Sequence, residues 1–266
     1  MRILDFHTHA FPDSLAERAI SALAAASNGV QPETDGTIGG LLALMDKHGV
    51  EKAVIASIAT KPEQTPKILD WSLQVRSDRI IPFASVHPDS ADVAGDVERA
   101  AAAGLLGIKL HPLYQNFNVD DPRAFPLYDA IQESGLPLLI HAGYDIAFGD
   151  RDQASPNRFI PVLANFPRLK MVMAHFGGWR QVGVFLETIV GKNVFIDTSF
   201  ASGYCTGAQV RDVLSRHDTQ RIVFGSDAPW GGMRKQIAFV EELPASDAVK
   251  ERIFYRNGAA LLGPEQ

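Results

Sequence analysis

The chain has 266 residues, of which 46% are hydrophobic and 21% charged, and its formal net charge is −6. This length suits one large α/β domain or two small ones, and the acidic balance argues against a nucleic-acid binder that relies on a basic surface. The lone cysteine, Cys205, excludes an intrachain disulfide and a zinc site built from several thiolates. We find no apolar run of membrane-spanning length and no signal-peptide profile, so the sequence predicts a cytoplasmic protein that does not bind membranes.

Short β-branched or apolar runs alternate with segments of helical spacing along the chain. The predicted strands are Ile3–His9, Lys52–Ile58, Ile80–Val86, Leu106–His111, Pro137–His141, Lys170–His175, Val194–Ser199 and Arg221–Asp227. Several helical segments between them end in Gly or Pro just before the next strand, as helix stops do. This order predicts an α/β protein, a (β/α)₈ (TIM) barrel, in a single domain over residues 1–266.

The connection from Ala10 to Glu51 is longer than the others and has room for two helices. The predicted barrel is therefore distorted, with an enlarged connection between its first and second strands. A doubly wound open sheet is the competing architecture, but no glycine-rich dinucleotide fingerprint follows the first strand.

The first predicted strand carries two histidines one residue apart, in "RILDFHTH". Because side chains alternate along a strand, Asp5, His7 and His9 are expected to share one face. Each neutral imidazole carries a donor and an acceptor that need partners, so a histidine pair fills a core poorly and binds a metal well. For an isolated H-x-H, two surface histidines are an equally good explanation.

Functional residues of such a barrel gather at the carboxyl ends of its strands. The strand ends here carry His7 and His9, Lys109 and His111, His141, His175, and Asp227. Barrel closure places all of these ends around one mouth, so the sequence predicts a metal site there. Imidazoles and a carboxylate suit Zn²⁺, with Mn²⁺ or Fe²⁺ as alternatives, and leave a coordination position open.

A metal in such a site lowers the pKa of a bound water and polarises a carbonyl oxygen. Asp227 is placed to orient that water and to carry its proton to the leaving group. An N-cap is the other interpretation of Asp227, since "SDAP" has cap-and-proline character.

The H-T-H motif, the histidines that end the fifth and sixth strands, and "GSDAP" after the eighth resemble the amidohydrolase superfamily. More narrowly, the pattern is similar to its "amidohydrolase 2" branch of metal-dependent hydrolases, lactonases and non-oxidative decarboxylases, over almost the whole chain. The resemblance implies that His7, His9, His141 and Asp227 are metal ligands or their close neighbours. It also implies that His175 binds a second ion or contacts substrate, which makes Asp227 and His175 the catalytic candidates.

Lys109 bears on the number of ions and on the reaction. In two-metal hydrolases of the superfamily, a lysine at the end of the fourth strand is carbamylated and bridges the ions, whereas typical decarboxylases lack it. The resemblance therefore implies one or two ions per chain, with Lys109 as a further ligand. Alternatively, an unmodified Lys109 pairs with a substrate carboxylate or with Asp5.

We therefore predict an enzyme, a metal-dependent hydrolase that cleaves a C–N or C–O bond of a small cyclic amide, lactone or ester. The alternative is a non-oxidative decarboxylase (carboxy-lyase) of an aromatic or unsaturated acid. A metal-dependent nuclease is disfavoured because such relatives usually have a glutamate on the fourth strand, where this chain reads "GIKLH". A structural metal protein is disfavoured because structural zinc sites prefer closure by cysteine.

Loops after the strands supply candidates for contact with a small-molecule substrate. They are His111, Tyr144, Arg151, Arg158, Trp179 and Trp230, with Tyr114, Gln115 and Phe117 as further wall residues. An arginine in this position could clamp a carboxylate, although a solvated loop arginine is commoner. Asp197 could orient a metal ligand, and we interpret His48, His87 and His217 as structural. The aromatic groups and the long first connection could also form a homodimer interface.

Overall fold

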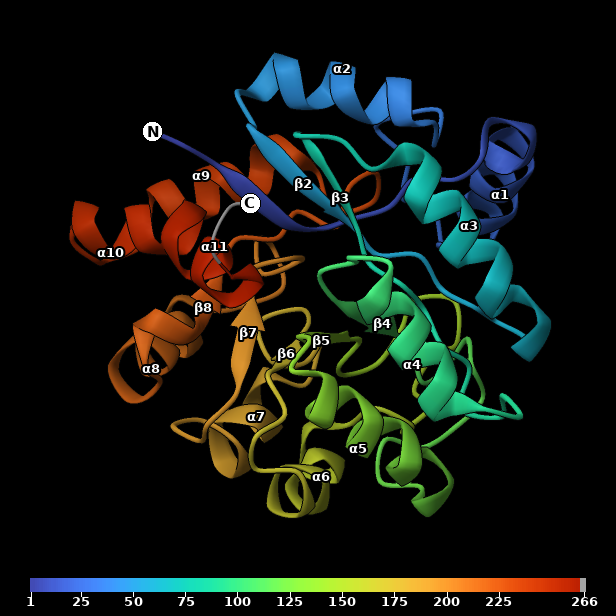
Figure 1. Cartoon of the computed structure of the whole chain (residues 1–266). Helices are drawn as coiled ribbons and strands as arrows, with labels where there is room; N and C mark the ends of the chain where they lie inside the picture. The colour runs from blue at the N-terminus through green and yellow to red at the C-terminus, as the bar shows by residue number, and fades with distance from the viewer. Residues whose placement is uncertain (264–266) are drawn as a thin grey trace.

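Eight parallel strands form the centre of the computed structural model, which describes residues 1–263 (Figure 1). They are β1 Leu4–Thr8, β2 Lys52–Ile55, β3 Ile80–Pro82, β4 Ile108–Leu110, β5 Leu138–Ile140, β6 Met171–Met173, β7 Phe195–Asp197 and β8 Ile222–Val223. Each lies inside one of the predicted runs and is shorter than it. The residues that follow each strand, where the predicted chemistry lies, therefore belong to the loops at the barrel mouth.

The strands pair in sequence order, β1 to β3 in one sheet and β4 to β8 in another. Two joints close them into a barrel. At the first, the Ala84 N–H donates to the Gly107 carbonyl at 2.9 Å; at the second, the Phe6 N–H donates to the Phe224 carbonyl at 2.8 Å. The predicted (β/α)₈ barrel is confirmed, and its closure places the end of β8 beside the end of β1.

Helices surround the strands on the outside (Figure 1). They are α1 Asp13–Ala26, α2 Ile38–His48, α3 Thr65–Val75, α4 Val93–Ala102, α5 Phe125–Ser134, α6 Phe159–Asn165, α7 Val182–Thr188, α8 Gly207–Arg216, α9 Met233–Glu241, α10 Asp247–Glu251 and α11 Asn257–Leu262. The enlarged connection after β1 holds α1 and α2, as predicted. Local signals set the bounds of α2: the Thr37 hydroxyl accepts the Gly40 N–H at the start, and Gly49, with φ 71°, ends it. None of the helices within residues 1–263 is long and apolar enough to cross a membrane.

Two apolar layers hold the barrel together. Inside it, buried side chains from strands all around the barrel form one cluster, which includes Phe6, Val54, Phe83, Leu139 and Val223. A larger cluster fills the space between strands and helices. Together they fix the strand ends, which is the rigidity that a site at the mouth requires.

The first strand departs from the strict alternation that its sequence indicates. Asp5 pairs with Ala53 and Thr8 with Ile55, so β1 has one more residue than β2 between these pairs. Such a bulge re-aims the side chains around it. His7 and His9 both line the cavity at the barrel mouth, while Asp5 lies beneath them, fully buried, and accepts the backbone N–H of Ser226 at 2.9 Å.

Candidate metal centre

The chemistry-bearing residues of five strand ends converge on one cavity of about 520 Å³. The predicted ligands all line it: His7, His9, Lys109, His141, His175 and Asp227. These residues come from β1, β4, β5, β6 and β8 or from the residues just after them, so barrel closure is what brings them together.

His7, His9 and Asp227 form the first ligand group. Oδ1 of Asp227 lies 2.8 Å from Nε2 of His9 and 3.4 Å from Nε2 of His7. This oxygen is buried, yet no hydrogen bond of good geometry reaches it from the described residues. A buried carboxylate oxygen without a hydrogen bond is costly. A divalent cation would satisfy it together with the two imidazole nitrogens, so the donor set fits a metal.

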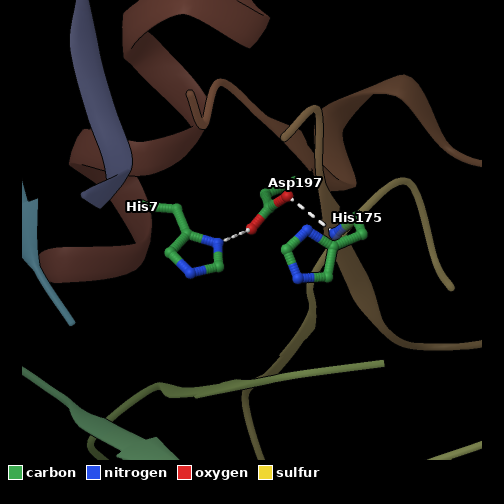
Figure 2. A group of neighbouring side chains, drawn as sticks. All are labelled: His7, His175 and Asp197. Atoms are coloured by element: carbon green, nitrogen blue, oxygen red, sulfur yellow. Dashed lines mark hydrogen bonds and ion pairs between the residues drawn. The ribbon is translucent and has the colours of Figure 1, made fainter. Parts of the chain in front are cut away.

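Asp197 fixes the orientation of the His7 ring through its Nδ1 atom (Figure 2). Its Oδ2 lies 2.8 Å from Nδ1 of His7, and its Oδ1 accepts the backbone N–H of His175 at 2.9 Å. Burial lowers the pKa of His7 well below its usual value, so the imidazole is neutral. With its proton on Nδ1, facing the carboxylate, His7 presents the Nε2 lone pair to the cavity, the arrangement common to metal-binding histidines.

His141 and His175 lie in direct contact on the neighbouring strand ends. Nδ1 of His141 is 2.9 Å from Nε2 of His175, and Nε2 of His141 is 3.0 Å from the Tyr144 carbonyl. The carbonyl can only accept, so the proton of neutral His141 lies on Nε2 and its Nδ1 directs a lone pair at Nε2 of His175. Burial lowers the pKa of both imidazoles well below the usual value.

His175 and Asp227 also share an uncommon backbone conformation. Their φ angles are 61° and 58°, in the left-handed region. This region costs a residue with a side chain roughly 1–2 kcal/mol, and such strained residues concentrate at functional sites. The fold thus holds both catalytic candidates in conformations that a relaxed loop would avoid.

Lys109 lies at the centre of the cluster. Its Nζ is 3.0 Å from Nε2 of His7, and the residue is 1% exposed. Burial lowers the pKa of this ammonium to about 8, although the carboxylates of Asp227 and Asp197 oppose the shift. The barrel therefore keeps an amine beside the predicted metal ligands.

A second group of potential ligands lies on the other side of His141. The His111 ring stacks on the His141 ring with centroids 4.1 Å apart. Nε2 of His111 lies 3.4 Å from Oδ2 of Asp145, and these two residues with His141 form a further set of possible ligands. Asp145 is absent from the residues that the sequence singled out. The sequence of this loop favours its aromatic and arginine side chains as substrate contacts, and no periodicity indicates where a loop carboxylate points.

The predicted substrate contacts divide into two groups. Tyr114, Tyr144, Trp179 and Trp230 line the cavity together with His111. The structure places neither predicted arginine on that lining: Arg158 pairs with Asp120 at 2.9 Å, and the guanidinium of Arg151 lies 5.6 Å from the ring centre of Phe148.

The remaining candidates are structural in this arrangement. The Gln115 side-chain amide donates to the carbonyls of Ala59 and Val86, and Phe117 is buried in the outer core. His217 lies next to the Val194 carbonyl, remote from the cavity lining, in line with its interpretation as structural.

Ser199 is a further residue of the site that was not predicted from the sequence. Its hydroxyl lies 2.8 Å from Nδ1 of His175 and also bonds Oδ1 of Asp197. Ser199 therefore links the two residues that orient this side of the cluster. The sequence indicates this position, because Ser199 follows Asp197 by two residues in the predicted strand Val194–Ser199, and side chains two residues apart on a strand share one face.

Comparison with solved structures places the chain among barrels of the same shape. The 5-carboxyvanillate decarboxylase LigW of Sphingomonas paucimobilis superposes with a TM-score of 0.71 at 21% identity, covering 98% of each chain. A probable 2-pyrone-4,6-dicarboxylic acid hydrolase of Acinetobacter baumannii gives 0.70 at 16% identity, over 99% of this chain and 100% of that one. At these identities the likeness establishes the fold.

Sequence comparison with curated proteins finds dihydroorotases over part of the chain. That of Aliivibrio fischeri is 27% identical over 110 residues, which is 38% of this chain and 32% of the relative. That of Delftia acidovorans is 35% identical over 89 residues, 30% of this chain and 26% of the relative. The matches thus span about a third of the length of these relatives.

A family model described as Amidohydrolase covers nearly all of the chain, from residue 4 to residue 263. Its span includes every strand and every predicted ligand described above. The chain therefore belongs to the amidohydrolase family.

Proposed function

We propose that this protein is a metal-dependent carboxy-lyase, which releases the carboxyl group of an aromatic or unsaturated acid as CO₂ without a redox step. The observation that carries the proposal is the wall of the cavity. Aromatic rings of Tyr114, Trp179, Phe200 and Trp230 line the same cavity as the histidine–aspartate cluster. Such walls suit a planar ring, whose faces and edges they can contact.

The structural neighbours support this choice over hydrolysis. Besides the carboxyvanillate decarboxylase, they include a 2,6-dihydroxybenzoate decarboxylase complexed with 2,6-dihydroxybenzoate, with a TM-score of 0.73 at 16% identity. A dihydroxybenzoic acid decarboxylase of Polaromonas, at 16% identity, holds manganese. The comparisons therefore favour the alternative of the two predicted reactions, and Mn²⁺ joins Zn²⁺ as the metal to test.

The residues that would hold the ion are His7, His9 and Asp227, which form one group of potential ligands, together with His141, which lines the same cavity. A divalent ion bound there supplies Lewis-acid chemistry, since it polarises a substrate oxygen. When the bond to the carboxyl group breaks and CO₂ leaves, its electron pair stays on the substrate carbon, which must then take a proton. We assign the delivery of that proton to Asp227, which takes it up from solvent and passes it to the carbon.

His175 has a positioning role in this scheme. Its ring lies against His141, and the Ser199 hydroxyl holds its Nδ1.

Hydrolysis of a cyclic amide, lactone or ester is the second candidate, and Lys109 is the observation that favours it. Its amine lies 3.0 Å from His7 within the ligand cluster. A carbamate on this amine would add oxygen ligands, and the cluster could then hold two ions. The pyrone hydrolase neighbour and the partial match to dihydroorotases also support this candidate.

One experiment separates the two reactions. Protein loaded with Mn²⁺ or Zn²⁺ in bicarbonate buffer is given carboxyl-labelled hydroxybenzoates, and in parallel lactones and cyclic amides. We expect labelled CO₂ from an acid, lost in Asp227→Asn while the protein still unfolds cooperatively. Ring opening of a lactone or amide without CO₂ release, with two ions per chain that fall to one in Lys109→Ala, would instead establish the hydrolase.

A further inference from the structure

The cavity extends beyond the metal centre, along two helices of the barrel rim. From the first connection it is lined by Phe11, which follows His9 by two residues, and then by Leu15 and Leu23 of α1. Leu15 and Leu23 are eight residues apart, which corresponds to about 12 Å along a helix axis. The hollow is therefore elongated beside α1.

The helix α3 lines the same cavity from the next connection. Its contribution is Gln64, just before the helix, and then Lys67, Ile68 and Trp71. These positions are spaced i, i+3, i+4 and i+7, which is one continuous helix face. Figure 1 places α1 and α3 next to each other at one side of the barrel, so the two faces border one channel.

The part of the cavity between these helices, which we call the α1–α3 lobe, is mainly apolar. Its apolar lining is Phe11, Leu15, Leu23, Val30, Ile58, Ile68 and Trp71, and the polar side chains of Ser27, Thr60, Gln64 and Lys67 line it as well. Lys67 brings a charge to this wall, but its aliphatic stem can cover apolar surface while the ammonium stays in water.

The side chains of the lobe are not needed to anchor α1. In α1 the buried side chains are Ala16 and Ile20, which face the protein, whereas Leu15 is 40% exposed. Contiguous apolar side chains left exposed in a concave surface mark a binding site. The lobe residues and the predicted metal ligands line one cavity, so a single ligand can reach both.

We propose that the α1–α3 lobe binds an apolar substituent of the substrate. The substrate is then an acid whose carboxyl end reaches the metal centre and whose alkyl or aryl chain lies between α1 and α3, in place of a bare hydroxybenzoate. Only the acid group of this ligand rests on the proposed function. The lobe itself is defined by its lining residues.

A homologous series of ligands tests the inference. Calorimetry on the metal-loaded protein measures the dissociation constants of benzoate and of para-alkylbenzoates from methyl to pentyl. We expect affinity to rise up to about fourfold for each methylene group that the lobe buries. In Leu15→Ser and Leu23→Ser this gain per methylene should shrink at least twofold, while the affinity for benzoate itself stays the same.

Leu73→Ser is the matched control. Leu73 lies on α3 with 38% exposure, close to that of Leu15, but it is not among the residues that line the cavity. An affinity that is flat along the series, or a Leu73→Ser effect equal to that of Leu15→Ser, would overturn the inference. The protein could release no CO₂ from any acid and yet bind longer alkyl chains more tightly, with Leu15→Ser reducing that gain in affinity. This result would uphold the lobe and remove the carboxy-lyase. CO₂ release from hydroxybenzoates without any gain in affinity along the alkyl series would uphold the carboxy-lyase and remove the lobe.

Discussion

Nδ1 of His7 lies 2.8 Å from Oδ2 of Asp197, and both side chains are almost fully buried. The other oxygen of Asp197 accepts the backbone N–H groups of His175 and Ser199, each at 2.9 Å. One carboxylate from β7 thus ties the ligand strand β1 to the end of β6. Because all these partners donate, Asp197 can serve them only as an acceptor on both oxygens.

Asp197→Asn should therefore weaken metal binding without removing a ligand. The amide NH₂ would face either His7 or the two backbone donors, so either the His7 ring or the backbone of His175 and Ser199 would lose its acceptor, and the His7 ring would be held less firmly. Substitutions behind a metal ligand typically cost 10–100-fold in metal affinity, and we expect a loss in that range. Competition with a chromophoric chelator measures it. Asp212→Asn, at an exposed position of α8, is the control, and equal affinities in the two variants would contradict the role assigned to Asp197.

His9→Ala removes one of the predicted ligands, so we expect metal content to fall by at least about tenfold relative to the native chain. Nε2 of His9 lies 2.8 Å from Oδ1 of Asp227, and losing it leaves that oxygen with only the more distant His7 nitrogen. Elemental analysis after dialysis against buffered Mn²⁺ or Zn²⁺ gives ions per chain. His48→Ala, a change to a helix histidine of α2 away from the cavity lining, should keep the full content. An unchanged content in His9→Ala would place the ion elsewhere.

The barrel and the convergence of its ligands could be predicted from the sequence because both follow from periodicity. Strand runs recur between helical segments, and parallel strands of a closed barrel all end at one mouth. His141 and Asp227 are distant in sequence, yet this rule alone brings them to one cavity.

Loop paths and the bulge could not be predicted in the same way. "LDFHTH" alternates regularly, and nothing in it marks the additional residue of β1 between Asp5 and Thr8. The loop after β5 has no periodicity that would indicate which of its side chains face the cavity. We predicted Arg158 as a substrate contact, but it pairs with Asp120. Asp145 was not predicted, yet it lies against His111. Side-chain direction in a loop depends on tertiary partners that local sequence does not encode.

The buried carboxyl group of Asp5 should make the stability of the fold depend on pH. Burial raises the pKa of its carboxyl group from 3.8 to about 7, and one oxygen, Oδ2, has no hydrogen-bond partner among the described residues. Between pH 3.8 and about pH 7, the carboxyl group of Asp5 is protonated in the folded chain and ionised in the unfolded chain. Its contribution to stability is thus complete below pH 3.8 and is lost as the pH rises through about 7.

Asp5→Asn removes this titration and keeps an oxygen that can accept the N–H of Ser226. The variant should match the native chain near pH 4 and exceed its free energy of unfolding by up to about 4 kcal/mol at pH 8. Urea unfolding of both proteins in excess chelator, at several pH values, measures the difference. Asp70→Asn, an exposed change on α3, should show no such trend. A variant that is less stable at pH 8 than the native chain would show that the ionised carboxylate is needed.

Cys205 should resist alkylation in the folded protein. Burial raises the pKa of its thiol to about 12. The thiolate is the reactive form, and at pH 8 it would make up about one part in ten thousand, against roughly a quarter for a free cysteine with a pKa near 8.5. We expect iodoacetamide to modify the native chain about a thousandfold more slowly than the chain unfolded in guanidinium chloride, as mass spectrometry can follow. Because Cys205 lies just after β7, between the cavity residue Phe200 and α8, equal rates would mean that this segment opens readily in solution.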